Sequence, residues 1–186
     1  PDVRAASALP EGYVFTDCAS AMQAWRERLP AAVDLVKALA VAELEVAGRY
    51  VESEHDAVFA AYDADSLTAA DLALLPDMLV CIPPEHNDAP ENAGLLEMLS
   101  SGLPVKVLVQ VSDLLEEASI GTGRFAFGVR SARLATTAMG LGGMYVLQCA
   151  SAALPAMRGR VARGMASHAP ALFTVYAGSP APAAGW

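Results

Sequence analysis

Val105-Lys-Val-Leu-Val-Gln-Val111 is a run of apolar, mostly β-branched residues, and it determines the fold that we expect. Similar runs are Met78-Leu-Val-Cys-Ile82, Met144-Tyr-Val-Leu-Gln148 and Leu172-Phe-Thr-Val-Tyr176, and helical segments separate all four. Strands that are apolar on both faces and alternate with helices are typical of a parallel sheet that is covered on both sides. We therefore predict a three-layer α/β domain with a mainly parallel sheet. Ligands of such sheets gather at the carboxyl ends of the strands.

The residues before the first of these strands have a helical pattern. Capping residues and apolar spacing predict two helices over about 17–29 and 31–50, with Pro30 in the first turn of the second. A third helix is expected over 53–62 and a fourth begins near Ser66. The expected organisation is a helical subdomain over 1–76, an α/β domain over 77–178 and a tail over 179–186.

Composition excludes several classes of protein. Of the 186 residues, 54% are hydrophobic, so the chain can bury a core and is not disordered. The longest uncharged stretch, 134–157, is long enough to span a bilayer. Its three glycines and Pro155 fit a helix, a turn and a buried strand better than a membrane helix. No signal peptide is visible at the start, so we expect a cytoplasmic protein without membrane contact.

Charge is divided unequally along the chain. Residues 1–117 contain all 21 acidic residues and six of the 12 basic ones, a net charge of −15. Residues 118–186 contain six arginines and no acidic residue. An overall charge of −9 argues against nucleic-acid binding. The arginines either pair with the acidic half inside the fold, which we favour, or face an anionic cofactor or partner.

The three cysteines do not indicate a metal centre. Cys18, Cys81 and Cys149 are widely spaced and form no Cys-x-x-Cys pair, so neither a zinc site nor an iron–sulfur cluster is expected on this chain. The loop at 85–88, which reads Glu-His-Asn-Asp, offers oxygen and nitrogen ligands. We interpret it as a solvated loop rather than a substitute metal site.

Three stretches carry a resemblance to a known family. They are Gly94-Leu-Leu-Glu-Met-Leu-Ser-Ser-Gly-Leu-Pro-Val-Lys-Val-Leu-Val109, Thr137-Ala-Met-Gly-Leu-Gly-Gly-Met-Tyr-Val-Leu-Gln-Cys-Ala150 and Pro170-Ala-Leu-Phe-Thr-Val-Tyr-Ala177. In order and spacing, residues 94–179 resemble the thiamine-diphosphate-binding domain of the pyruvate:ferredoxin (2-oxoacid:ferredoxin) oxidoreductase family. The resemblance covers a little under half of the chain. It implies the oxidative decarboxylation of a 2-oxoacid such as pyruvate, with thiamine diphosphate and Mg²⁺ as cofactors.

The resemblance also implies where the cofactor would bind. The family's metal-binding element after its second strand aligns with the segment that begins at Ser112 and Asp113, and Ser112 keeps a hydroxyl there. Gly121 and Gly123 resemble displaced glycines of the same element. The backbone of 119–124 can cradle an anion, with Arg124 adding positive charge, although a plain flexible loop is the simpler interpretation.

Two positions depart from the family pattern. The Asp of the family's Gly-Asp-Gly metal turn is replaced by Pro84, and proline also removes a backbone N–H. The cysteine expected near the end of the domain is replaced by Ser179. We therefore expect a degenerate cofactor site and no iron–sulfur cluster. The chain is then either part of a larger oxidoreductase, with other domains or subunits as partners in an oligomer, or a non-catalytic structural or docking domain.

Overall fold

A computed structural model describes residues 12–72, 74–84, 89–111, 118–120, 123–125 and 129–177. The chain divides into two compact units. One consists of residues 22–76, which we call the helical unit. The other consists of residues 1–21 and 77–186, which we call the α/β unit.

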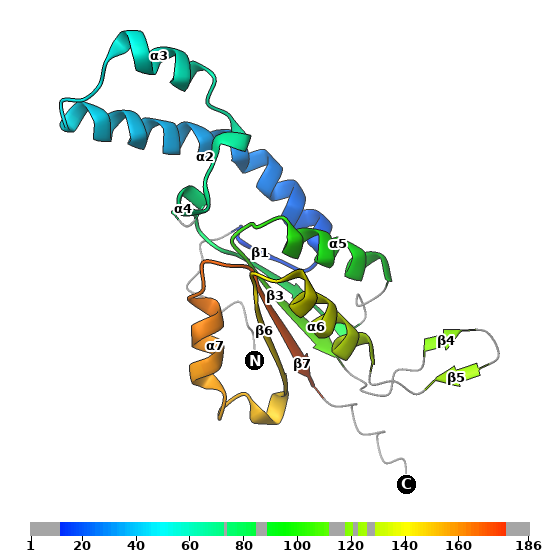
Figure 1. The fold of residues 1–186 in the computed structure, drawn as a ribbon. Coiled ribbons are helices and arrows are strands. Elements are labelled where there is room, and N and C mark those ends of the chain that lie inside the picture. The colour runs from blue at the N-terminus through cyan, green and yellow to red at the C-terminus, as the bar shows by residue number, and fades with distance from the viewer. Residues whose placement is uncertain are drawn as a thin grey trace. The chain divides into compact units, whose positions relative to one another are not determined.

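The α/β unit is built on a five-stranded sheet in which all described strands are parallel. Their order across the sheet is β1-β2-β3-β7-β6 (Figure 1). The strands are β1 (Val14–Phe15), β2 (Met78–Ile82), β3 (Val105–Val111), β6 (Tyr145–Ala150) and β7 (Ala171–Tyr176). The predicted α/β architecture with a mainly parallel sheet is therefore confirmed.

Three helices cover the sheet: α5 (Ala89–Ser100), α6 (Val129–Leu141) and α7 (Arg158–Met165). The connections from β2 to β3 and from β3 to β6 cross the sheet in one direction, whereas the connection from β6 to β7 returns. Because such crossovers are right-handed, α5 and α6 lie on one face and α7 lies on the other. Figure 1 shows this arrangement.

Apolar side chains fill both interfaces between helices and sheet. On the side of α5 and α6, Val107 and Val109 of β3 are fully buried, as are Leu95 and Met98 of α5. On the side of α7, the side chains of Leu147, Ala171 and Phe173 pack against Met157, Val161 and Met165. Burial on both faces explains why the central strands have almost no polar residues.

One buried cation fixes the amino edge of the sheet. Lys106 has no exposed side-chain surface, and its Nζ lies 3.3 Å from a carboxylate oxygen of Asp77. The same ammonium group donates hydrogen bonds to the carbonyl oxygens of Ser167 and, at 3.0 Å, of Ala169. Its charge is therefore satisfied by the segments that lead into β2 and β7, as a buried lysine requires.

The helical unit contains most of α2 (Cys18–Val46), together with α3 (Glu52–Ala60), a 3₁₀ turn η1 (Ala64–Ser66) and α4 (Ala69–Leu72). The predicted break at Pro30 is wrong, because α2 continues through this residue. The fixed φ of proline suits a helix. Its missing N–H and its clash with the preceding turn cost about 3 kcal/mol, and helix-forming residues on both sides offset this cost.

Candidate functional site

The carboxyl edge of the sheet has the topology of a ligand site. After β3 the chain crosses to β6 on the side of α6, and after β6 it returns to β7 on the side of α7. The loops that follow β3 and β6 therefore leave toward opposite faces, with β7 between them. Such a switch point opens a crevice outside the strand ends, and ligands of parallel α/β sheets bind there.

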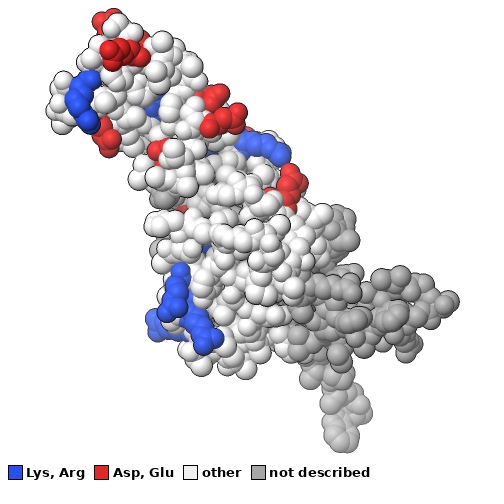
Figure 2. Space-filling view, viewed as in Figure 1, with Lys and Arg blue, Asp and Glu red and all other residues white. Residues whose placement is uncertain are grey.

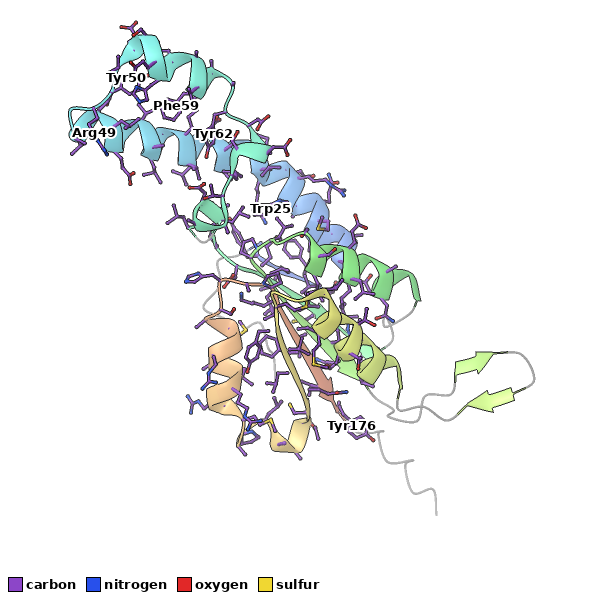
Figure 3. All side chains as sticks on the ribbon, viewed as in Figure 1. Trp25, Arg49, Tyr50, Phe59, Tyr62 and Tyr176 are labelled. Atoms are coloured by element: carbon purple, nitrogen blue, oxygen red, sulfur yellow. The ribbon has the colours of Figure 1, made fainter. Side chains whose placement is uncertain are left out.

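The strand register identifies the described residues at this crevice. Tyr176 is the last residue of β7, and it is paired with Val111 on one side and with Ala150 on the other. Its side chain is half-buried and is labelled at the end of β7 in Figure 3. Tyr176 thus brings a phenol to the centre of the carboxyl edge. The sequence indicated that this residue belongs to a strand but not that it lies at the switch point.

The five residues predicted from the sequence to bind a cofactor are placed only in part. Ser112, Asp113 and Gly121 lie outside the described residues. Gly123 and Arg124 belong to β5 (Gly123–Phe125), where they pair with Ile120 and Ser119 of β4 (Ala118–Ile120). The attachment point of Ser112 is nevertheless fixed, because Val111 ends β3 beside Tyr176.

The flexible loop expected over 119–124 is contradicted at 119–120 and 123–124, which belong to two strands. β4 and β5 form an antiparallel hairpin, a two-stranded sheet separate from the main one. Ile120 is β-branched, and β-branched residues favour extended backbone. The pairing of 118–120 with 123–125 commits some of their backbone groups to the hairpin, so fewer amides are available for an anion cradle.

The described start of the loop after β2 offers neither a backbone N–H nor a carboxylate to a metal-bound diphosphate. Ile82 is buried at the end of β2, and Pro83 and Pro84 follow it, both partly exposed. Neither proline can donate a backbone hydrogen bond. The tetrapeptide at 85–88 lies outside the described residues. Among the residues that the structure places, no group of three His, Cys, Asp or Glu side chains could hold a metal ion.

The residues described at the carboxyl edge therefore do not fit magnesium and a diphosphate by themselves. Ile82, Val111, Ala150 and Tyr176 together offer one phenol and no carboxylate. Mg²⁺ takes oxygen ligands in a near-octahedral arrangement, commonly with one or two carboxylates. Such ligands would have to come from residues outside the described ranges, Asp113 among them, or from another chain.

A second group of polar and aromatic residues lies in the helical unit. Tyr50, His55, Phe59 and Tyr62 form a stack in which neighbouring ring centroids are 5.3 to 6.4 Å apart (Figure 3). The phenol of Tyr50 donates a 2.5 Å hydrogen bond to a carboxylate oxygen of Asp56. This hydrogen bond is the main cause that raises the pKa of Tyr50 to about 12.

The depression next to this aromatic stack is open to solvent. Its lining residues are Val51, Glu52, Ser53, Asp56 and Ala57. It presents two carboxylates and no cationic side chain, so it offers no means of holding an anionic substrate. The carboxyl edge of the main sheet remains the better candidate for a ligand site.

Comparisons with protein-family models, with curated proteins and with solved structures gave no match. The helices within the described ranges include none that is long and apolar enough to cross a membrane.

Proposed function

We propose that this chain is a domain of a 2-oxoacid:ferredoxin oxidoreductase-like protein in which the thiamine-diphosphate site is degenerate. The reaction in question is the oxidative decarboxylation of a 2-oxoacid such as pyruvate. The proposal rests on the resemblance of residues 94–179 to the cofactor-binding domain of that family. Thiamine diphosphate, when bound with Mg²⁺, supplies the carbanion chemistry of such reactions.

One structural observation supports this assignment more than any other. The segment that resembles the family's metal-binding element begins at Ser112, directly after β3. β3 ends at the switch point of the sheet, beside Tyr176. The residues singled out by sequence likeness therefore follow the strand whose end borders the crevice where an α/β sheet binds its ligand.

A non-catalytic docking domain is the second candidate, and Pro84 favours it. The prolines after β2 remove backbone donors where a phosphate would need them. Ser179, which replaces the cluster cysteine of the family, lies outside the described residues. In this alternative the fold is retained to shape a larger assembly, and no other domain or subunit supplies the missing ligands for the metal and the cofactor.

Calorimetric titration with thiamine diphosphate and Mg²⁺ separates the two candidates. The cofactor-binding proposal predicts saturable heat that requires the metal and weakens about tenfold in Ser112→Ala, because one charge-assisted ligand is lost. Ser100→Ala is the matched control. Its exposed hydroxyl bonds the carbonyl of Glu97 at the end of α5, away from the carboxyl edge. Absence of saturable heat up to millimolar cofactor would favour the docking domain.

A further inference from the structure

The helical unit leaves much of its apolar surface uncovered. Its described hydrophobic side chains that are at least nine-tenths buried are Trp25, Ala32, Val36 and Phe59. Six large apolar side chains of the same unit are between 44% and 91% exposed: Leu35, Leu39, Val46, Val51, Val58 and Leu74. A unit of this size that exposes more large apolar side chains than it buries has only a small core of its own.

Half of these exposed side chains form one stripe along α2. Leu35, Leu39, Ala42 and Val46 are all exposed, and their 4-3-4 spacing places them on one face of the helix. The buried Val36 follows Leu35 and so lies about 100° around the helix from it, beside the stripe. At 1.5 Å per residue the stripe is about 16 Å long. A stripe of this kind is typical of a helix that packs against a second helix.

Carboxylates border this stripe. Asp34, Glu43 and Glu45 are exposed, and the helical spacing puts them on its two flanks. The whole helical unit contains ten acidic and four basic residues, a net charge of −6. Asp34, Glu43 and Glu45 make no ion pair within the described part of the chain. A helix that packs here should therefore be positively charged along its sides.

The exposed face of α7 has complementary properties. Gly159, Ala162 and Ala166, the residue that caps the helix, are exposed and share one face, which we call the small face. Arg158, Arg160 and Arg163 are exposed beside this small face. The opposite face of α7 packs on Phe173 through Val161 and Met165. The small face is therefore the side of α7 that faces away from the sheet.

The arginines of α7 have no carboxylate of their own to pair with. Arg158, Arg160 and Arg163 make no ion pair with any described residue, and residues 118–186 contain no Asp or Glu. Figure 2 shows the blue arginine surface of α7 as a group without red atoms among it. The pairing that the sequence led us to favour for the basic half is thus not found for these three residues.

We propose that the stripe of α2 in one copy of this chain packs on the small face of α7 in a second copy. Large side chains on α2 meet small ones on α7, and carboxylates on one helix meet arginines on the other. Pairing of two α2 stripes would instead bring six carboxylates of like charge together. A single helix pair buries less area than a stable complex needs, so two such contacts, one in each direction, form the dimer.

The test is a charge exchange followed by sedimentation velocity over a range of protein concentrations. The wild-type chain should self-associate, and NaCl should weaken the association because the flanking pairs are solvent-exposed. Glu43→Arg and Arg160→Glu should each weaken it by about tenfold or more, since like charges then face each other across both contacts. Mixed in equal amounts, the two variants should associate again, because each contact in the mixed dimer joins opposite charges.

Glu97→Arg is the control for the change in net charge. Glu97 is exposed on α5, outside the stripe, so its reversal should leave the dissociation constant unchanged. Circular dichroism of every variant checks that the surface changes leave the helices intact. A monomer at all concentrations, or single variants that associate like the wild type, would overturn the proposal. A mixture that does not recover would also overturn it. So would a result in which the charge variants have no effect and only Leu39→Asp, which changes the apolar stripe, prevents association.

Discussion

At the scale of single residues, Thr174 has a buried hydroxyl group for which the described residues offer no hydrogen-bond partner. Its side chain is 1% exposed in the middle of β7, and its Oγ1 has no partner among the described residues. A buried hydroxyl without a partner costs free energy, and valine has nearly the same shape without the polar atom. The position therefore invites two substitutions with opposite expected effects.

Thr174→Val should raise the free energy of unfolding by about 1 kcal/mol, because it removes an unsatisfied polar atom. Thr174→Ser keeps the hydroxyl and loses a buried methyl group, so it should lower the same quantity by about 1 kcal/mol. Urea unfolding of the two variants measures both effects. A less stable valine variant would mean that the hydroxyl has a partner in the folded protein.

The hydrogen bond between Tyr50 and Asp56 predicts a pH dependence. This bond, followed by burial and by nearby carboxylates, raises the pKa of Tyr50 from 10.0 to about 12. Because the pKa of Tyr50 in the folded state lies above its unfolded value, this hydrogen bond contributes its full stabilisation below pH 10. It is lost as the pH rises through about 12.

Asp56→Asn should lower the pKa of Tyr50 toward 10.0, since the charged acceptor that favours the neutral phenol is gone. The ultraviolet absorbance of tyrosinate, followed during a titration, reports the change when the curve of Tyr50→Phe is subtracted. An unchanged titration in Asp56→Asn would show that burial, not the carboxylate, is the main cause.

At the scale of elements, α7 packs closely against the sheet because Gly164 has no side chain. A Cβ on Gly164 would lie 2.6 Å from ring atoms of Tyr145 and 2.7 Å from Phe173. The Tyr145 hydroxyl also donates a hydrogen bond to the carbonyl of Arg160, so this ring cannot move without cost. Gly159, in the same helix, has open space around it.

Gly164→Ala should therefore lower the free energy of unfolding by roughly 1–2 kcal/mol, because overpacking outweighs the better helix propensity of alanine. Gly159→Ala should raise it by up to about 1 kcal/mol, since only the propensity changes there. Thermal unfolding at low protein concentration compares the two variants without a contribution from association. Equal effects of both would contradict close packing at Gly164.

The elements differ in how far the sequence could predict them. β2 and β3 have the predicted limits, because a strand buried on both faces is a continuous apolar run between polar turns. β6 begins and ends one to two residues later than expected, and its alternating burial gives a weaker pattern. The single helix α2 was missed because proline usually marks a helix boundary, and the hairpin of β4 and β5 because its strands have three residues each.

The candidate site depends on strand order, which no local pattern contains. Ser112 could be placed after a strand from sequence alone, but its neighbour across the sheet could not. Tyr176 lies at the switch point only because β7 enters between β3 and β6. For the same reason Lys106, a single lysine within an apolar run, could not be assigned its three partners in advance.

At the scale of the whole molecule, the helical unit is an insertion between neighbouring strands. β1 and β2 pair directly, and residues 22–76 lie between them in the chain. The α/β unit can therefore keep its core whatever the length of this insertion. The acidic, apolar surface belongs to the insertion, whereas the arginines belong to α7. Substitutions that alter either surface, and with it the proposed association, should leave the sheet intact.

The position of β7 constrains how the protein can be made. It follows the other four strands of this sheet in the sequence, yet it lies between β3 and β6 and joins them. During synthesis on a ribosome, β3 and β6 emerge first, each with an apolar edge that has nothing to pair with. The sheet can close only after residues 171–176 have left the exit tunnel, so β3 and β6 stay unjoined until that point of synthesis. Until then the nascent chain exposes two strands that are prone to aggregation, which makes it a natural client for a chaperone.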